Sequence, residues 1–321
     1  MKQPMRLTAL VLSVIFTLGA TACSNKTDDP VYTVGICQLN QHAALDDSTR
    51  GFMDALEAAL PGQVTFDRQN ASNEISQCSS IVNQFIAADV DLILANATPA
   101  LQAAAAATNM IPILSTSITE YSAALDVELK NGTVGGNISG TSDLTPPDEQ
   151  AELVHVWFPD AKNIGLLYCS AEANSQYQIE SVRAELEKLG YLCTLFPFTD
   201  SNDLFFVVEG AVSTSDVIYT PTDNTVAANA AIIDNVCRPA GVPVIGGDMG
   251  ICSGCGVAAL CIDYYELGYA TGEMAAQILT GTTNISDMPI QYTKPVFVYN
   301  AEICADLGLT PPDGYTAINA E

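Results

Sequence analysis

One pattern recurs along this chain and constrains its fold more than any other feature. A short apolar run rich in β-branched residues leads through a polar loop into an amphipathic helix, first over residues 31–38 and 49–60 and again over residues 163–169 and 179–189. Strands that alternate with helices at this spacing predict a parallel sheet covered by helices on both faces.

A longer internal match indicates that this arrangement occurs twice. Residues 91–115 and residues 216–247 share one order, which is strand, polar loop, alanine-rich helix, proline and strand, at an offset of about 125 to 130 residues. A chain of 321 residues suits two α/β lobes of ordinary size. We therefore predict two similar lobes. Residues 135–147, rich in Gly, Pro, Ser and Thr, are expected at the first crossing between them.

The N-terminus has the features of an export signal. Two basic residues precede an apolar run over residues 7–18, and small residues lead up to Cys23. That run is too short to cross a membrane core, which needs about 20 apolar residues. We expect residues 1–22 to be a signal peptide, Cys23 to carry a lipid that anchors the exported protein to the cell membrane, and residues 23–30 to be a polar tether. Cleavage before Cys23 without lipidation is the alternative.

The cysteines form neither a complete set of pairs nor a zinc motif. The chain has 10 cysteines, so an odd number remains once Cys23 is set aside. Cys252 and Cys255 form a CxxC motif with Cys261 nearby, but no second CxxC exists and the chain has only 2 histidines. We expect no metal and no cofactor. Whether these cysteines form a local disulfide or remain free thiols is left open.

The charge balance argues against one class of partner. The chain has 37 Asp and Glu against 11 Lys and Arg, which gives a formal net charge of -26. Binding to nucleic acid depends on basic side chains that neutralise phosphates. We therefore expect no nucleic-acid partner.

Polar side chains follow the predicted strands at positions where a buried core would continue with apolar ones. Ligands of open α/β sheets bind beyond the carboxyl ends of the strands, so these positions are the candidate ligand-binding residues. In the first half of the chain they are Gln38, Asn40, His42, Thr98, Ser115, Thr116 and Ser117. Thr98, predicted at a helix N-cap, and the three hydroxyls of residues 115–117 suit a carboxylate. A plain helix cap at Thr98 and a His42 that only fills a polar loop are the alternatives.

The second half of the chain offers acidic and amide side chains at equivalent places. The candidates are Asn174, Ser175, Asp223, Asn224 and Asp248. A carboxylate that faces a desolvated ammonium group forms a short, charge-assisted contact. The alternative for Asp223 is capping of the next helix, and for Asp248 it is closure of a glycine-rich turn. Donors on one side and carboxylates on the other predict a zwitterionic ligand, such as an amino acid.

Motifs of catalysis are missing from the sequence. It contains no GxSxG, HExxH or Walker loop, and no GxGxxG after a strand. With two histidines, acid–base chemistry would rest on carboxylates, and the pair Asp46 and Asp47 is better explained as the start of the first helix. We therefore expect a binding protein and not an enzyme. A structural or adhesion lipoprotein would have no need of the polar strand ends.

Several segments resemble one known family, in the same order and over nearly all of the chain from residue 31 to about residue 281. They are VGICQLNQHAALDDSTRGFMDAL, NATPALQAAAAAT with IPILST, GGNISGTSD, TPTDNTV, PVIGGDMG and IDYYELGYATGEMAAQILTG. They resemble the ABC-transporter substrate-binding lipoproteins related to tryptophan and tyrosine uptake. The chain departs from that family's pattern in its cysteine content and in Ala43, where a Pro commonly follows the His.

The resemblance implies an α/β fold of the type I periplasmic-binding-protein kind, with two doubly wound parallel-sheet lobes joined by a three-strand hinge. It implies residues 31–144 plus 260–288 in the first lobe and residues 145–259 plus 289–321 in the second. The implied function is the extracytoplasmic substrate-binding component of an ABC importer, a monomer that traps a small ligand in the interlobe cleft and meets an ABC permease. An amino acid is expected, with an aromatic one favoured and an aliphatic one open. The alternative is a ligand-binding lipoprotein of a signalling receptor.

Overall fold

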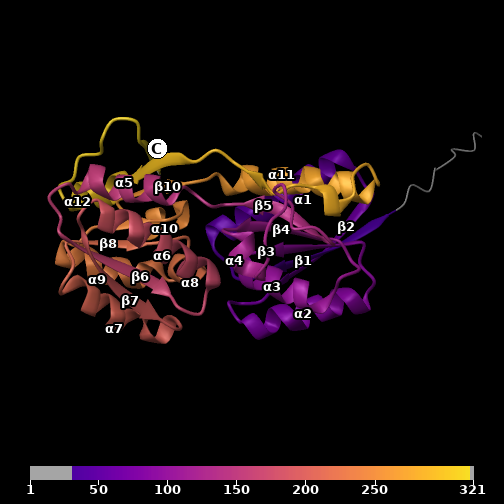
Figure 1. The fold of residues 1–321 in the computed structure, drawn as a ribbon, viewed down its shortest axis with the longest axis horizontal. Coiled ribbons are helices and arrows are strands. Elements are labelled where there is room, and N and C mark those ends of the chain that lie inside the picture. The colour runs from indigo at the N-terminus through magenta and orange to yellow at the C-terminus, as the bar shows by residue number, and fades with distance from the viewer. Residues whose placement is uncertain (1–30, 319–321) are drawn as a thin grey trace, which may run out of the picture. The chain divides into compact units, whose positions relative to one another are not determined.

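The computed structural model describes residues 31–318, which form two sheets, each with helices on both faces (Figure 1). The first sheet is parallel throughout and has the strand order β11-β5-β4-β3-β1-β2. Its strands are β1 (Tyr32–Gln38), β2 (Val64–Asn70), β3 (Leu92–Asn96), β4 (Ile113–Ile118), β5 (Ile138–Ser142) and β11 (Gln291–Tyr292). Its helices are α1 (Ala43–Ala59), α2 (Ile75–Ala87), α3 (Thr98–Ala107), α4 (Tyr121–Leu125), α11 (Tyr264–Leu279) and the 3-10 helix η1 (Ile285–Asp287).

Alternation along the strands of this sheet sends side chains to two separate cores. Val34 and Ile36 of β1 pack with α1 and α11, whereas Cys37 packs with α2 and α3 on the opposite face. The strands are therefore buried on both faces, which explains why they read as continuous apolar runs and not as alternating ones.

The second sheet has the order β13-β12-β10-β9-β8-β6-β7, and only the pairing of β10 with β12 is antiparallel. Its strands are β6 (Asn163–Cys169), β7 (Leu192–Phe198), β8 (Val217–Thr220), β9 (Val244–Gly246), β10 (Ala258–Cys261), β12 (Val296–Asn300) and β13 (Thr316–Ile318). Helices α5 (Pro147–Trp157), α6 (Ala173–Lys188) and α12 (Ala301–Asp306) share one core, and α7 (Ser201–Val212), α8 (Asn224–Ala228), α9 (Ala230–Ala240) and α10 (Met249–Gly254) share another. The expected α/β fold with two parallel-sheet lobes is confirmed.

The chain passes between the two sheets three times. It crosses after β5, after β10 and after β11, and α11 returns to the first lobe, where it packs against α1. The sequence placed the third boundary after residue 288, but β11 pairs with β5 and the side chain of Ile290 is buried in the core of the first lobe. The chain thus leaves the first sheet only after Tyr292, because this short strand extends that sheet. No helix within residues 31–318 combines the length and apolar character needed to span a membrane.

Close packing of α1 against α11 depends on glycines. A Cβ atom at Gly268 would collide with the backbone carbonyl of Ser48, whereas a Cβ atom at Gly210 of α7 would meet open space. Alanine is favoured over glycine in a helix by about 0.5 to 1 kcal/mol, but overpacking against backbone costs about 1 to 3 kcal/mol. We expect Gly268→Ala to lower the free energy of unfolding and Gly210→Ala to raise it slightly, as measured by urea denaturation. Equal effects of the two substitutions would contradict this packing.

Candidate functional site

A cavity lies where the carboxyl ends of the strands of both lobes meet, and its free volume is about 10 Å³, which is about the space of one water molecule. Each lobe contributes side chains from the loops that directly follow its strands, as expected for open α/β sheets. The lining residues are His42, Leu45, Ser117, Thr119, Asp143, Asn174, Thr222, Asp223, Asn224, Asp248 and Tyr264. In this arrangement of the lobes, a ligand larger than a water molecule has room only if the lining side chains or the lobes move apart.

Six of the twelve residues that the sequence singled out line this cavity. They are His42, Ser117, Asn174, Asp223, Asn224 and Asp248. A register shift in β4 between Ser115 and Ile118 accompanies a positive φ of 58° at Ser117. Such bulges re-aim side chains near functional sites, and this one brings Ser117 to the cavity.

Of the other six, five form hydrogen bonds within their own lobes. Gln38 donates to Asn40 O and to Asp46 Oδ1, and Asn40 Oδ1 accepts from Gln41 N. Ser115 Oγ forms a hydrogen bond with Tyr121 OH, and Thr116 Oγ1 accepts from Thr141. Ser175 Oγ accepts from Asn174.

Thr98 was expected at a helix N-cap, but it is the first residue of α3, and Ala97 with a φ of 88° takes the cap position. The N-cap assignment was therefore wrong by one residue, because Ala97 and not Thr98 adopts the non-helical conformation.

Sequence reasoning missed five lining residues, of which Asp143 and Tyr264 have the clearest chemistry. Both lie next to crossings between the lobes, where a Gly/Ser/Thr-rich stretch and a Tyr pair were interpreted as linker and packing. Leu45, Thr119 and Thr222 are the others. The usable signal was that Asp143 follows a buried strand, the same signal that identified the other candidates.

Three hydrogen bonds join the lobes directly around the cavity. The first lies between His42 Nε2 and Asn224 Oδ1 at 3.3 Å. Asn73 Nδ2 donates to Thr225 Oγ1 at 3.1 Å, and Gln178 Nε2 donates to Thr119 Oγ1 at 3.3 Å. The two lobes are therefore in contact over the site.

Asp223 and Asp248 cap helices, which was the alternative interpretation of each. Asp223 Oδ1 accepts from Val226 N and its Oδ2 from Cys169 N, while Asp248 Oδ1 accepts from Ile251 N. Burial raises the pKa of Asp223 to about 8 and that of Asp248 to about 7. Both oxygens of Asp223 are thus engaged within its own lobe. Contact of either carboxyl group with a ligand stays a prediction.

Asp143 presents a different arrangement. Its Oδ2 accepts from Tyr264 OH at 3.0 Å, but its Oδ1 is buried without a partner. Burial raises the pKa of Asp143 to about 6, and the hydrogen bond from Tyr264 acts in the opposite direction. One acceptor of a buried carboxyl group is therefore left free at the cavity.

His42 offers a second free acceptor. Asn224 Nδ2 donates to Glu172 Oε2 at 2.7 Å, so Asn224 Oδ1 is the acceptor that faces His42 Nε2, and this ring nitrogen carries the proton. Burial lowers the pKa of His42, which favours the neutral ring. His42 Nδ1 is then an acceptor, and it is buried without a partner.

Asn174 supplies the third free acceptor at the cavity. Its Nδ2 donates to Thr222 O at 2.9 Å and to Glu172 Oε2 at 3.2 Å, which identifies its Oδ1 as an acceptor, and this atom is buried without a partner. Leaving a buried polar atom unpaired costs about 1 to 3 kcal/mol, so three such atoms around one cavity call for an explanation. No Lys or Arg is among the described residues that line it. The cavity suits a ligand with several N–H donors and a positive charge.

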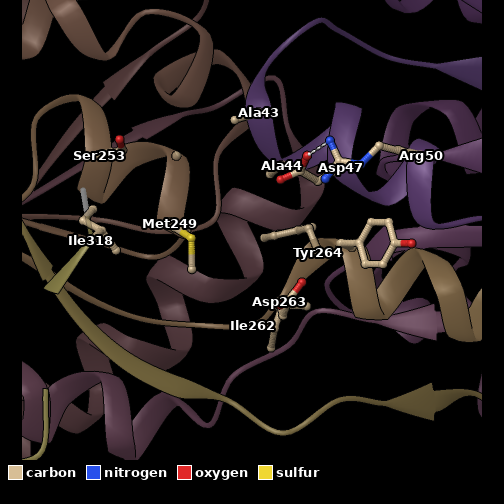
Figure 2. Close-up of a pocket in the computed structure, with 12 residues that line it drawn as sticks. Ala43, Ala44, Asp47, Arg50, Met249, Ser253, Ile262, Asp263, Tyr264 and Ile318 are labelled. Carbon is tan, nitrogen blue, oxygen red and sulfur yellow. Dashed lines mark ion pairs between the residues drawn. The ribbon is translucent and has the colours of Figure 1, made fainter. Parts of the chain in front are cut away.

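Figure 2 shows a second pocket, lined by residues of α1, α10, the start of α11 and Ile318. It is larger than the first, with a volume of about 330 Å³. Asp47 and Arg50 form an ion pair at 2.9 Å on its wall. None of its lining residues has a buried polar atom without a partner, so its chemistry does not call for a polar ligand. Tyr264 is the one residue common to both pockets. The smaller cavity is therefore the candidate site.

The cysteines of the described part of the chain are all free thiols, which is one of the two alternatives left open by the sequence. Cys252, Cys255 and Cys261 are buried. Within residues 31–318, no group of three or more His, Cys, Asp and Glu side chains is placed to hold a metal ion.

Comparison with known proteins gives consistent matches. A family model described as ABC transporter substrate binding protein matches residues 33–320. A protein named tyrosine-binding protein, from Clostridioides difficile, is 36% identical over 272 residues, which cover 83% of this chain and 78% of that protein. The crystal structure of an ABC domain in complex with L-Trp from Streptococcus pneumoniae is 31% identical, covers 90% of this chain and 100% of its own, and superposes with a TM-score of 0.85.

A third match bears on the arrangement of the lobes. A ligand-free, open substrate-binding protein with adhesive properties from Clostridium difficile is 35% identical and covers 91% of this chain and 100% of its own, with a TM-score of 0.69. Sequence identity is higher for this open structure than for the complex with L-Trp, yet structural similarity is lower. The present chain thus superposes better on the complex with L-Trp than on the open, ligand-free structure.

Proposed function

Because the chain belongs to the family of ABC transporter substrate-binding proteins, we propose that it binds an aromatic amino acid, tyrosine or tryptophan, in the cavity between its lobes and delivers it to an ABC permease. The matches indicate a solute-binding protein and not an enzyme. Support for an aromatic ligand comes from the tyrosine-binding relative and from the complex with L-Trp, both more than 30% identical to this chain.

One observation carries the assignment of an amino acid: three buried acceptors without partners surround a cavity that no Lys or Arg lines among the described residues. His42 Nδ1, Asp143 Oδ1 and Asn174 Oδ1 match in number the three N–H donors of an α-ammonium group. Asp143 supplies the negative charge, so its hydrogen bond with the ammonium group would be charge-assisted. The sequence assigned this charge to Asp223 and Asp248, and the structure supports Asp143 for it.

The α-carboxylate has to be held by neutral donors. Hydroxyl groups of Ser117, Thr119 and Thr222 line the same cavity. Ser117 donates to Ser48 Oγ and Thr222 donates to Gly247 O, so these two would have to exchange those bonds for a contact with the carboxylate. Thr119 Oγ1 accepts from Gln178 and keeps its own proton to donate. We propose that the six predicted residues that do not line the cavity support the loops that carry the contacts. They are Gln38, Asn40, Thr98, Ser115, Thr116 and Ser175.

Closure of the lobes provides the mechanism. A ligand that contacts Asp143 of the first lobe and Asn174 of the second lobe favours the closed arrangement over an open one, because only the closed arrangement offers both contacts. The permease then recognises the closed protein, which acts outside the cytoplasm as a monomer.

Isothermal titration calorimetry with a panel of amino acids tests this function. L-Tyrosine and L-tryptophan are expected to bind at least about tenfold more tightly than L-leucine, L-isoleucine and L-valine, since each tenfold step is about 1.4 kcal/mol. Equal binding of aliphatic and aromatic amino acids would overturn the aromatic preference. Failure of every amino acid to bind would overturn the proposed ligand class.

Cys23 and the preceding export signal lie outside the described residues. We propose that Cys23 carries the lipid anchor, on the basis of the sequence pattern before it. Cys23→Ala is expected to move the protein from the membrane fraction to the soluble fraction, as followed by immunoblotting. Cys193→Ala, at a partly buried free thiol, is the matched control and should leave the protein in the membrane fraction. Membrane retention of the Cys23 variant would contradict the anchor.

A further inference from the structure

Asp143 and Tyr264 join two of the three crossings between the lobes. Asp143 directly follows β5, where the chain first leaves the first sheet, and Tyr264 begins α11, where the chain returns. Tyr264 OH donates to Asp143 Oδ2 at 3.0 Å, and both side chains are buried. One hydrogen bond therefore connects residues 121 positions apart in the sequence at the hinge.

We propose that Tyr264 is a positioning residue, whose hydroxyl holds Asp143 in its charged form with Oδ1 free for the ligand ammonium and links that charge to the hinge. This inference rests on the proposed function, because it concerns the same cavity. It adds a role for a side chain that need not touch the ammonium group. It also adds a physical route from the ligand charge to the crossings on which closure depends.

Burial makes this support necessary. A carboxylate in a dry site is disfavoured unless donors stabilise it, and a hydrogen bond to the charged form lowers its pKa. Tyr264 OH donates to Asp143 Oδ2 at 3.0 Å, and this bond lowers the pKa of Asp143 against the effect of burial. Loss of the hydroxyl should raise the pKa of Asp143 further. The protonated form of Asp143 cannot attract an ammonium charge. On acidification, the variant without the hydroxyl would therefore lose binding at a higher pH than wild type does.

Other titratable groups face Asp143 from the surrounding elements, and none of them is positively charged in the described cavity. Asp248 at the start of α10 and Tyr121 of α4 are close enough to interact with its charge, and Asp223 and the neutral His42 line the same cavity. These groups are unchanged by substitution at residue 264. A difference between variants therefore reports on the Tyr264–Asp143 bond.

The test is the pH dependence of the Kd for L-tyrosine between pH 5.5 and 8.5, in wild type and in Tyr264→Phe. Phenylalanine keeps the ring that separates the cavity from the second pocket and removes only the hydroxyl. The expected result is an affinity close to that of wild type at pH 8.5 but about fivefold weaker than wild type at pH 6, because the acid loss of binding moves up by about one pH unit from a pKa of about 6. Tyr265→Phe is the matched control, since the Tyr265 hydroxyl donates to Asp54 outside the cavity, and its profile should follow wild type.

The outcomes separate this inference from the proposed function. A Tyr264→Phe profile parallel to wild type overturns the positioning role, while wild-type discrimination against N-acetyl-L-tyrosine leaves the ammonium site intact. Equal binding of N-acetyl-L-tyrosine and L-tyrosine by wild type overturns both. A double-variant cycle gives a second measurement. In Asp143→Asn, the added Tyr264→Phe substitution should no longer shift the pH profile, and a shift that persists overturns the inference.

Discussion

Asp143→Asn is expected to weaken the binding of L-tyrosine by about a hundredfold at pH 8. The substitution keeps the size of the side chain and an acceptor for Tyr264 OH, but it removes the charge that faces the proposed ammonium group. Losing the charged partner of a buried pair typically costs about 2 to 5 kcal/mol, which corresponds to a factor of about 30 or more in Kd. Isothermal titration calorimetry measures the change directly.

Asp263→Asn is the matched control for this variant. Asp263 is exposed and caps α11 by accepting from Glu266 N, and it lines the second pocket but not the candidate cavity. Asparagine caps helices about as well as aspartate, so the Kd of the Asp263→Asn variant for L-tyrosine should equal that of wild type. An Asp143→Asn variant that binds within threefold of wild type would exclude Asp143 as the ammonium partner.

Asp248→Asn is expected to stabilise the ligand-free protein at pH 8 by about 2 to 4 kcal/mol and to change little at pH 4. Burial raises the pKa of Asp248 to about 7, so folding takes up a proton at this group. The stability that this proton contributes is complete below about pH 4 and is lost as the pH rises to about 7, where about three pKa units amount to about 4 kcal/mol. Asparagine keeps the Oδ1 acceptor for Ile251 N without a buried charge.

Urea denaturation at the two pH values measures this effect. Asp200→Asn serves as the control, because Asp200 caps α7 in the same way, through Oδ1 and Asn202 N, but is exposed. Its stability should change equally and little at both pH values. Stabilisation of Asp248→Asn that is the same at pH 4 and pH 8 would show that the carboxyl group is not buried in its charged form. The same variant, titrated with L-tyrosine, tests whether Asp248 also contacts the ligand.

The two-lobed fold could be predicted because its signals are local. Short apolar strands and the helices that follow them are set by residues close in sequence, and the repeated strand–helix order showed that the arrangement occurs twice. The strand β11 could not be found in this way, because Gln291 and Tyr292 are both exposed and pair with β5 only through their backbone. Its place in the first sheet depends on packing of the neighbouring Ile290 in that lobe.

The candidate site could be predicted in part for the same reason. The rule that ligands bind beyond strand ends selected His42 and Asn174, two of the three residues with free acceptors. It also selected Gln38, whose side chain instead bonds to Asp46 and Thr49 within the first lobe. The position of a residue at a strand end indicates where its backbone lies. It does not indicate whether its side chain already forms hydrogen bonds with other residues. The pairing of Asp143 with Tyr264 depends on how two crossings meet in space, which no local pattern indicates.

We propose above all that the cavity between the lobes recognises an α-ammonium group through free acceptors. Calorimetric titration of the wild-type protein with L-tyrosine and with N-acetyl-L-tyrosine at pH 8 tests it, because acetylation removes the positive charge and two of the three N–H donors. We expect N-acetyl-L-tyrosine to bind at least about a hundredfold more weakly than L-tyrosine, or not measurably. Equal affinities for the two compounds would contradict it.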